Sequence, residues 1–595
     1  MRHRIRAISF FGGAGALLLL AAANARDTTL LLSLDAQFML LLLGAAAVVF
    51  GLGANMPHRF ALRFGAQGWA LLLLTLVALA LRLWQAGALV HYFVDELNFV
   101  EGVLGVQRAQ QSGEALALLH PFHWLAAFPR LYPYWQSWGT ALAGHDLAGL
   151  RLASALIGAL TVPAVYFCGR QFFDRKVALL AALLLATFPP HLHFSRLALN
   201  NVADPLFATL ALAFAARGLR TGRHGDCALA GALLGASQYF YEGGRLLYPA
   251  VMALWLIFAA RKQPGQIAVC ALAFALVALP LYSVTLSYQL PLMPRLADKG
   301  LGEAYWRDLL LSPPERGLLA QHAAHMAKAF LIYVTYPDES FYYGGHAALL
   351  LAYLVPPFLL GVARALRCGP RVLPLLLLLA ALGNSLLRFS AWAAGFVVTF
   401  PALCLLTAWG CCALWGWARA YFSRLRWRQG VGSGKRKIYQ VILLRLPWSL
   451  LIALLLAGAQ VGYYFALHLP GYNLQLRPVA DAQDALFRAL EFPAGTRVHL
   501  VGDIVFYEFD RQRMLAFLGR GDLQVDIVRH IAEGTEFTAA YLLALARDVD
   551  QAFFIERAED AALLQQYFVV QGPFYSPYNV PPERQLALYY YEAAP

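Results

Sequence analysis

Charged residues are scarce in this sequence. Of its 595 residues, 14% are Asp, Glu, Lys or Arg and 60% are hydrophobic, and the hydrophobic residues form long runs. Because a hydrocarbon core of about 30 Å needs about 20 residues of helix, the sequence predicts a polytopic helical membrane protein. The net charge of +13 fits positively charged cytoplasmic loops and lipid head-group contacts. No basic-aromatic soluble module is present, which argues against a nucleic-acid partner.

Cysteine is also rare, with seven residues in all. None lies in the predicted outer loops or in the C-terminal region, and no pair has the CxxC spacing of a metal site. This distribution argues against a disulfide framework.

Apolar segments close to the length of a membrane span recur along the chain. They lie near residues 8–23, 36–54, 69–89, 148–168, 177–193, 201–216, 227–241, 246–260, 266–287, 346–363, 372–387, 391–418 and 447–468, which makes about thirteen predicted transmembrane helices. In the long segment 91–147, QSGEALALLH and LYPYWQSWGTALAG are typical of short amphipathic helices. After the last span, strand-like runs such as RVHLVG and QAFFIE alternate with helical runs such as EDAALLQQYF.

The predicted fold class is an all-α polytopic membrane protein with a small C-terminal α/β domain. We expect two additional N-terminal helices in residues 1–68. A transmembrane catalytic domain should follow in 69–470, with outer loops at 91–147 and 288–345, and a soluble domain in 471–595. Lys and Arg are frequent in alternate short loops, most of all in RLRWRQGVGSGKRK, and rare in the others. The positive-inside rule then predicts a cytoplasmic N terminus and a periplasmic C-terminal domain in a bacterial inner membrane.

The N-terminal stretch MRHRIRAISFFGGAGALLLLAAANA allows two interpretations. Its basic start, apolar middle and Ala-Asn-Ala end resemble a cleavable signal peptide. We expect an uncleaved first helix, with cleavage as the alternative.

Two adjacent carboxylates, Asp95 and Glu96, follow the predicted span 69–89 in the stretch HYFVDELNF. A carboxylate beside an apolar helix end is partly desolvated, which raises its basicity and suits a general base. The alternative is a solvated loop start.

A second polar group lies in FPPHLHFSRLALNNVADPLF, between the predicted fifth and sixth spans. It contains Arg196, Asn201 and Asp204, and ionisable groups inside spans usually face a cavity or a partner. Asp204 could equally cap the helix that contains Pro205. His191 and His193 leave a divalent metal open, with a hydrogen-bonding pair as the alternative.

Further candidates lie in other predicted outer turns. Arg245, in QYFYEGGRLLYPAV, and Arg388, in NSLLRFSAWAAGF, are candidate phosphate ligands, with snorkelling to the head groups as the alternative. Candidate contacts for a sugar or an acceptor are Tyr241, Asn201, Asp338 and Glu339. Acidic and basic groups at several outer loops suit a lipid-linked donor that meets a polar acceptor at the membrane surface.

These motifs resemble the membrane glycosyltransferases of the GT-C fold, in particular the glycosyltransferase family 39-like superfamily of protein O-mannosyltransferases and lipid A aminoarabinose transferases. The resemblance rests on the Asp-Glu pair after a long apolar helix and on the run from LAGLRLASALIGAL to LNNVADPLFATLALAF. It extends from about Trp69 to Pro401.

The resemblance implies a polyprenyl-phosphate-linked sugar as donor and an inverting displacement at the anomeric carbon. It maps an essential aspartate onto Asp95, with Glu96 beside it, and a second acidic residue onto Asp204. By position, Arg196, Arg245 and Arg388 would support the leaving phosphate. A lipid, glycan or protein is the expected acceptor, membrane lipids are expected partners, and no cofactor is certain. A flippase or transporter of lipid-linked sugars and a non-catalytic assembly protein are the alternatives.

Overall fold

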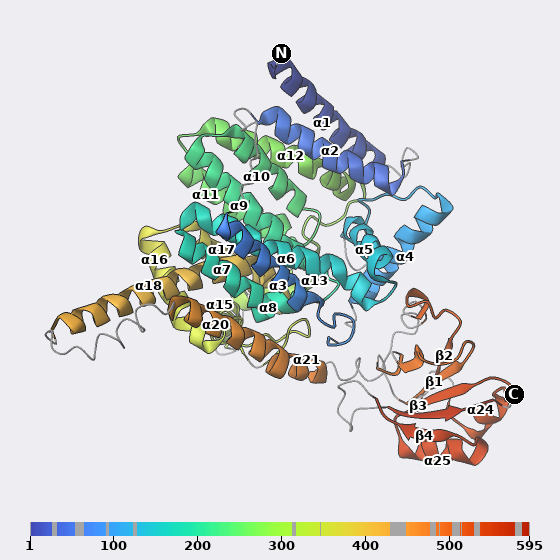
Figure 1. Cartoon of the computed structure of the whole chain (residues 1–595). Helices are drawn as coiled ribbons and strands as arrows, with labels where there is room; N and C mark the ends of the chain where they lie inside the picture. Colours follow the sequence, from blue (N-terminus) through green and yellow to red (C-terminus); the bar gives the residue numbers. More distant parts are fainter. Residues whose placement is uncertain are drawn as a thin grey trace. The chain divides into compact units, whose positions relative to one another are not determined.

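The computed structural model shows a chain made mostly of helices that ends in a small sheet (Figure 1). The residues it describes are 2–25, 32–53, 65–90, 95–122, 128–311, 317–345, 347–428, 448–475, 484–486, 488–502, 512, 515–528, 536–576 and 586–593. The core of the predicted basic loop, residues 429–437, and the start of the predicted acidic loop, residues 91–94, lie outside these ranges.

The chain forms two compact units. The first contains Met1–Trp84, Ala109–Tyr132 and Ser154–Tyr464, and the second contains Gln85–Arg108, Pro133–Ala153 and Phe465–Pro595. Asp95 and Glu96 therefore belong to the second unit, whereas all the other predicted site residues belong to the first.

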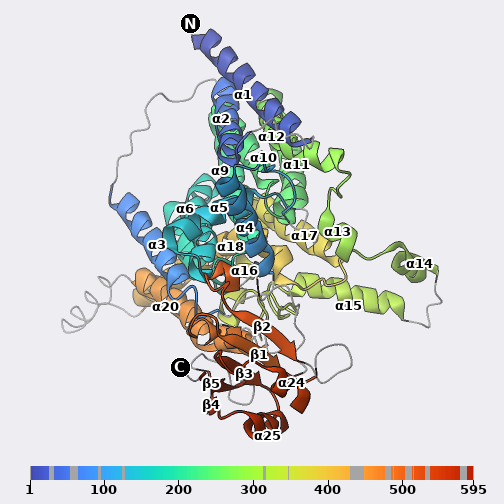
Figure 2. The ribbon, with the colours of Figure 1, turned by 90° about the vertical axis from the view of Figure 1, so that its right-hand side faces the viewer.

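Helices occur at every segment that was predicted to span the membrane. They are α1 (Arg2–Ala25), α2 (Leu34–Leu52), α3 (Ala66–Leu83), α6 (Leu147–Phe172), α7 (Arg175–Thr187), α9 (Ala203–Thr221), α10 (His224–Ser237), α11 (Tyr248–Ala259), α12 (Pro264–Ser287), α16 (Val355–Cys368), α17 (Val372–Ser385), α18 (Phe400–Arg428) and α20 (Trp448–Tyr463). In the first unit, α1 and α2 pack against each other and lie beside α10 and α12 (Figures 1 and 2).

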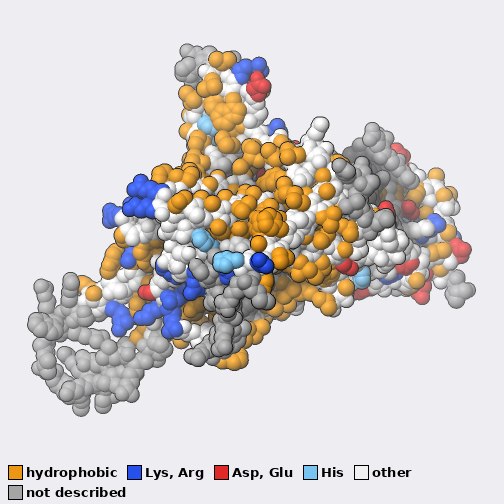
Figure 3. Space-filling view, turned by 90° about the horizontal axis from the view of Figure 1, so that it is seen from above, with side chains coloured by type: hydrophobic (Ala, Val, Ile, Leu, Met, Phe, Trp, Pro, Cys, Tyr) orange, Lys and Arg blue, Asp and Glu red, His pale blue; other side chains and the backbone are white. Residues whose placement is uncertain are grey.

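Fewer of these helices than predicted have the full length of a membrane span. Seven helices in the described part of the chain are long and apolar enough, or eight if the bent pair α16 and α17 forms one span. The others are shorter, and proline contributes to this: α7 ends at Thr187, just before Pro189 and Pro190. The predicted class of multi-pass helical membrane protein is confirmed, and hydrophobic side chains cover much of the helical surface in Figure 3.

Glycine allows close helix packing at the contact between α16 and α18. A Cβ atom on Gly361 would lie 2.0 Å from the Leu406 carbonyl oxygen, and one on Gly410 would lie 1.7 Å from the Pro357 carbonyl oxygen. The two backbones therefore touch, which is the usual role of small residues between membrane helices.

The shorter elements agree only in part with the sequence analysis. LYPYWQSWGTALAG forms α5 (Leu131–Ala143), but QSGEALALLH is not helical beyond Ser112, where α4 ends. Its backbone instead bonds to side chains of α1 and α2. The remaining helices are α4 (Glu96–Ser112), α8 (Pro189–Phe194), η1 (Asn200–Val202), η2 (Gly243–Leu247), α13 (Pro294–Lys299), α14 (Glu303–Leu311), α15 (Leu318–Leu331), η4 (Ala352–Leu354), η5 (Ala393–Thr399), η6 (Tyr464–His468), α21 (Leu469–Gln475), α24 (Ala539–Ala544) and α25 (Ala558–Tyr567).

The C-terminal part of the second unit is a small α/β domain, as predicted. Its strands are β1 (Arg497–Val501), β2 (Gln524–Val528), β3 (Gln551–Ile555), β4 (Gln571–Phe574) and β5 (Ala587–Tyr591), in the order β2-β1-β3-β5-β4. The first three are parallel, and β5 pairs antiparallel with β3 and β4. Strands β1 and β3 are almost wholly buried, which explains their continuous apolar runs.

Candidate functional site

Asp204 is buried in the first turn of α9, where it organises a neighbouring turn. Its Oδ1 accepts from the Tyr241 backbone N–H at 3.2 Å, and its Oδ2 accepts from the Gly244 N–H at 2.8 Å. A Cβ atom on Gly243 would lie 2.8 Å from Oδ2, and one on Gly244 would lie 2.9 Å from Oδ1. Two glycines therefore let the backbone approach the carboxylate. The residue before α9, Val202, forms no side-chain capping bond.

Arg245 follows these glycines within the short π-helical segment η2, and its side chain is buried. Its Nε donates to the Gln238 carbonyl oxygen at 2.7 Å. The guanidinium carbon lies 5.2 Å from the centre of the Phe128 ring, within the range of a cation–π contact. Single-turn π-helical segments occur often at functional sites.

Beside Arg245, a second arginine joins the same turn. The Arg295 backbone N–H donates to the Glu242 carboxylate, and its guanidinium donates to the Tyr241 hydroxyl. The Tyr241 ring stacks on Phe128, with ring centres 5.6 Å apart. Tyr241 thus contacts Arg295 directly and is linked to Arg245 through the Phe128 ring.

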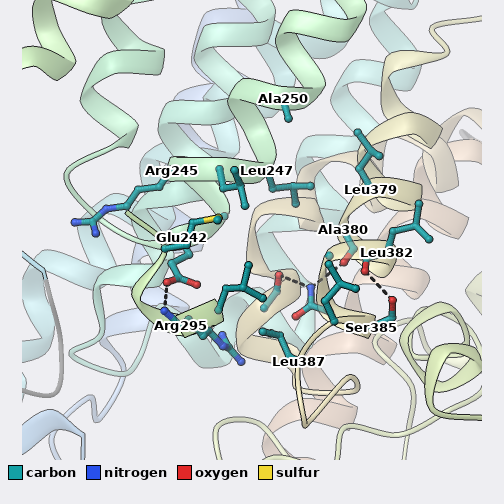
Figure 4. A pocket seen from close by; sticks show the side chains of 18 of the residues that line it. Glu242, Arg245, Leu247, Ala250, Arg295, Leu379, Ala380, Leu382, Ser385 and Leu387 are labelled. Atoms are coloured by element: carbon teal, nitrogen blue, oxygen red, sulfur yellow. Dashed lines mark hydrogen bonds between the residues drawn. The ribbon is translucent and has the colours of Figure 1, made fainter. Parts of the chain in front are cut away.

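These residues form one end of a cavity of about 550 Å³ in the first unit. Most of its wall is apolar and includes Leu246, Leu247, Leu292, Leu296, Leu379, Leu382, Leu386 and Leu387, together with Trp306 and His322. Figure 4 shows Arg295 reaching toward Leu387, while the Arg245 guanidinium extends away from the leucine-lined wall. The cavity therefore combines a long apolar wall with a charged end, and its size is that of a small-molecule site.

The surroundings shift the pKa of both Glu242 and Arg295. Burial raises the pKa of Glu242 above its ordinary value, although the Arg295 N–H and the charges of Arg295 and Arg245 oppose this. Burial alone would lower the pKa of Arg295, but Tyr241, Tyr342 and Glu242 raise it above its ordinary value. Arg295 is therefore held as a permanent cation beside a carboxyl group that gains a proton easily.

The predicted acidic pair lies in the second unit and divides into two different environments. Asp95 is partly exposed just before α4, whereas Glu96 is fully buried. Both Glu96 oxygens accept from Arg151, at 2.8 Å and 2.6 Å. Arg151 also donates to the Ala86 and Val90 carbonyl oxygens, so the pair ties the start of α4 to the chain that precedes it.

Arg196 has a very different setting from Arg245. Its guanidinium is fully buried and donates to the carbonyl oxygens of Leu81, Arg82 and Trp84, at 2.7, 3.2 and 2.8 Å. These carbonyls lie at the C-terminal end of α3, where the helix leaves acceptors unpaired. In this structure Arg196 therefore closes a helix end.

The other predicted contacts do not gather at the cavity. Arg388 is exposed and is not among the residues that line it. Asp338 is buried and accepts from Ser340, Gly344 and Ala393, which organises its own loop. Glu339 accepts from Lys328 at 2.7 Å, and Asn201 is buried near the start of α9.

Two important residues were missed by the sequence analysis. Arg151 stands alone in the apolar run LAGLRLASAL, and a single arginine within a span is a signal that could have been used. Arg295 directly follows Pro294 in the predicted outer loop, in the stretch PLMPRLADKG, where no periodic pattern singles it out. Within the described residues no cluster of three or more His, Cys, Asp or Glu side chains could hold a metal ion.

The fold and the site together define a multi-pass helical membrane protein with a charged end to a large apolar cavity. Residues 128–288 match the sequence profile of the family described as dolichyl-phosphate-mannose-protein mannosyltransferase. The match confirms the predicted resemblance over this segment, which includes Asp204 and Arg245. A search of curated protein sequences finds no match.

Solved structures with a similar arrangement have low sequence identity. ArnT from Cupriavidus metallidurans bound to undecaprenyl phosphate is 15% identical, with a TM-score of 0.48 over 89% of this chain and 100% of that chain. The oligosaccharyltransferase AglB from Archaeoglobus fulgidus, in complex with an inhibitory peptide and a dolichol-phosphate, is 13% identical, with a TM-score of 0.41 over 76% of this chain and 64% of that chain.

Proposed function

We propose that this protein is a glycosyltransferase that moves a sugar from a polyprenyl-phosphate donor to an acceptor at the outer face of a bacterial inner membrane. The observation that carries the proposal is the cavity, whose leucine-lined wall suits a prenyl chain and whose charged end contains Arg295 and Arg245. The match of residues 128–288 to a family that uses a lipid-phosphate sugar supports the same substrate class.

The chemistry follows from these groups. The bond between the anomeric carbon and the phosphate oxygen breaks, and the acceptor oxygen or nitrogen forms a new bond on the opposite face of the sugar. Arginine suits the leaving phosphate because its planar fork binds phosphate oxygens and stays charged. We assign this role to Arg295, whereas the Arg245 guanidinium extends away from the leucine-lined wall and packs against Phe128. Arg196, whose guanidinium donates to three backbone carbonyls, and Arg388, which is exposed, stay outside this group.

Asp95 is the proposed general base, which takes the proton of the attacking acceptor. It is the partly exposed member of the acidic pair, and the buried Glu96 accepts two hydrogen bonds from Arg151. Glu96 then acts as a positioning residue that fixes the start of α4 and with it the backbone of Asp95. Asp204 positions the turn that contains Arg245 through its two backbone hydrogen bonds.

The test uses purified full-length protein in lipid vesicles with radiolabelled polyprenyl-phosphate sugars and candidate lipid, glycan and protein acceptors. Wild type should form a labelled product with inverted anomeric configuration, and Asp95→Asn should lower the rate at least ~100-fold. Asp298→Asn, a matched change at an exposed aspartate, should keep the wild-type rate. Movement of intact donor across the vesicle without a new glycosidic bond would refute the transferase and support a flippase.

A further inference from the structure

The hairpin of α1 and α2 contains two buried amide side chains that do more than pack against each other. Asn24, at the end of α1, and Gln37, in α2, are both fully buried. The Asn24 Nδ2 donates to the Gln37 Oε1 at 3.1 Å and to the Leu20 carbonyl oxygen at 3.1 Å. The Gln37 Nε2 donates to the Leu32 carbonyl oxygen at 3.0 Å, and both side chains also bond to the chain segment 116–120.

This segment is held through its backbone. The Gln37 Nε2 donates to the Leu116 carbonyl oxygen at 2.8 Å, and its Oε1 accepts from the Leu118 N–H at 2.9 Å. The Asn24 Oδ1 accepts from the Leu119 N–H at 3.0 Å. The two amides thus satisfy backbone groups of the segment, which accounts for the absence of a helix over residues 113–120.

The held segment leads directly to the cavity residues. The His120 carbonyl oxygen accepts from the Arg130 N–H at 3.0 Å, and the Phe122 N–H donates to the Phe128 carbonyl oxygen at 3.2 Å. These two bonds flank the isolated bridge between Pro121 and Pro129, so residues 120–122 pair with residues 128–130. Phe128, on the far side of this pairing, stacks on Tyr241 and lies against the Arg245 guanidinium.

We propose that the α1–α2 hairpin is a positioning element of the candidate site, in which Asn24 and Gln37 anchor segment 116–120 so that Phe128 is held against Tyr241 and Arg245. Tyr241 in turn accepts from the Arg295 guanidinium, so the anchor extends to both cavity arginines. This inference rests on the proposed function for its catalytic meaning. It also gives α1 a role in the mature protein, because cleavage after the Ala-Asn-Ala stretch would remove Asn24.

The first experiment measures amide hydrogen exchange of full-length protein in lipid nanodiscs. Gln37→Met keeps the side-chain length but removes the hydrogen bonds, so peptides that cover 116–122 should exchange at least ~10-fold faster while α9 and α12 keep their protection. Gln171→Met, a matched change at the end of α6 away from this segment, should leave the exchange unchanged. Unchanged exchange in Gln37→Met would overturn the anchor.

The second experiment measures binding of undecaprenyl phosphate and the transfer kinetics. Gln37→Met and Asn24→Leu should weaken binding about three- to thirtyfold, the size of a lost cation–π contact, with a larger effect on KM than on kcat. Phe128→Leu, which leaves α1 and α2 intact, should reproduce this loss without faster exchange at residues 116–120. Faster exchange with unchanged binding in the amide variants would refute the positioning role.

Failure of the proposed function is distinguishable from failure of the anchor. If wild type transfers no sugar and binds no undecaprenyl phosphate, the transferase proposal and the catalytic meaning of the anchor both fail. The exchange measurement still decides whether Asn24 and Gln37 hold the segment. Mass spectrometry of the intact membrane-extracted protein should find α1 still attached, and its loss would contradict the anchor.

Discussion

Arg196 and Arg295 belong to the same compact unit but have different surroundings. Arg196 donates to three backbone carbonyls at the end of α3, all within the protein. Arg295 lies on a cavity wall, and its partners are the Glu242 and Tyr241 side chains of one turn. The first arrangement completes a helix, and the second leaves a charged group beside space for a ligand. The contacts that an arginine makes in the fold therefore indicate its role, and its identity as an arginine does not.

The largest expected effect comes from removing the structural arginine. Arg196→Met should leave the carbonyls of Leu81, Arg82 and Trp84 without their donor in a buried region, at a cost of about 3–6 kcal/mol. We expect little folded protein after extraction, measured by size-exclusion chromatography and thermal unfolding. Normal yield and melting temperature together with lost activity would reverse the comparison, because Arg196 would then act on the substrate.

The matched change at the cavity should separate stability from function. Arg295→Met should keep the melting temperature near that of wild type, but lower transfer and undecaprenyl phosphate binding about 100-fold, because a charge-assisted phosphate contact is lost. Arg367→Met, an exposed arginine in the last turn of α16, is the control and should resemble wild type. A large loss of stability in Arg295→Met would show that this arginine, too, is structural.

The carboxyl group beside Arg295 should give a pH dependence. Burial raises the pKa of Glu242, so lowering the pH neutralises it sooner than an ordinary glutamate. Loss of this negative charge should strengthen undecaprenyl phosphate binding about three- to tenfold as the pH falls through the raised pKa. For stability the sign is the usual one for a raised carboxyl pKa: the contribution is full below the unfolded pKa and is lost as the pH rises through the folded pKa.

Glu242→Gln is the variant that tests this dependence. It should bind as wild type does at low pH and should show only the titration of the lipid phosphate itself. A variant with the same pH profile as wild type would exclude Glu242 as the titrating group.

The smallest effect is expected at Glu339, a predicted sugar or acceptor contact that forms a surface ion pair with Lys328. Lys328 and Glu339 are both partly exposed, and although desolvation opposes it, the hydrogen bonds from Lys328 and Tyr336 lower the Glu339 pKa. Its stabilisation is present above the ordinary pKa of 4.5 and is lost as the pH falls through the lowered value. Glu339→Gln should change stability by at most ~1 kcal/mol by thermal unfolding. A tenfold loss of transfer in this variant would return Glu339 to the acceptor site.

Much of the helical architecture could be predicted because hydrophobic length determines where a chain can cross a lipid core. The end of α7 is readable from Pro189 and Pro190, because proline breaks a helix locally. The bend of 115° between α16 and α17 could not be predicted, since it depends on tertiary packing. The same reason explains why QSGEALALLH was predicted as a helix: its apolar spacing is real, but distant amides bind its backbone.

The candidate site was predictable only to the level of residue type and loop. Asp204 and Arg245 stand out because charge inside an apolar hairpin is costly. Their meeting through Gly243 and Gly244 is a backbone arrangement that no spacing rule supplies. Arg295 was missed because an arginine in a long loop that also contains Arg307 and Arg316 looks like any solvated residue until the fold places Tyr241 and Glu242 next to it.

The direct backbone contact between α16 and α18 has a mechanical consequence. Because Gly361 and Gly410 leave no gap between the two helices, they cannot slide or rotate past each other without a steric clash. This pair should therefore move as one rigid unit. The residues that line the cavity belong to other segments, so the cavity can change shape while α16 and α18 stay fixed to each other.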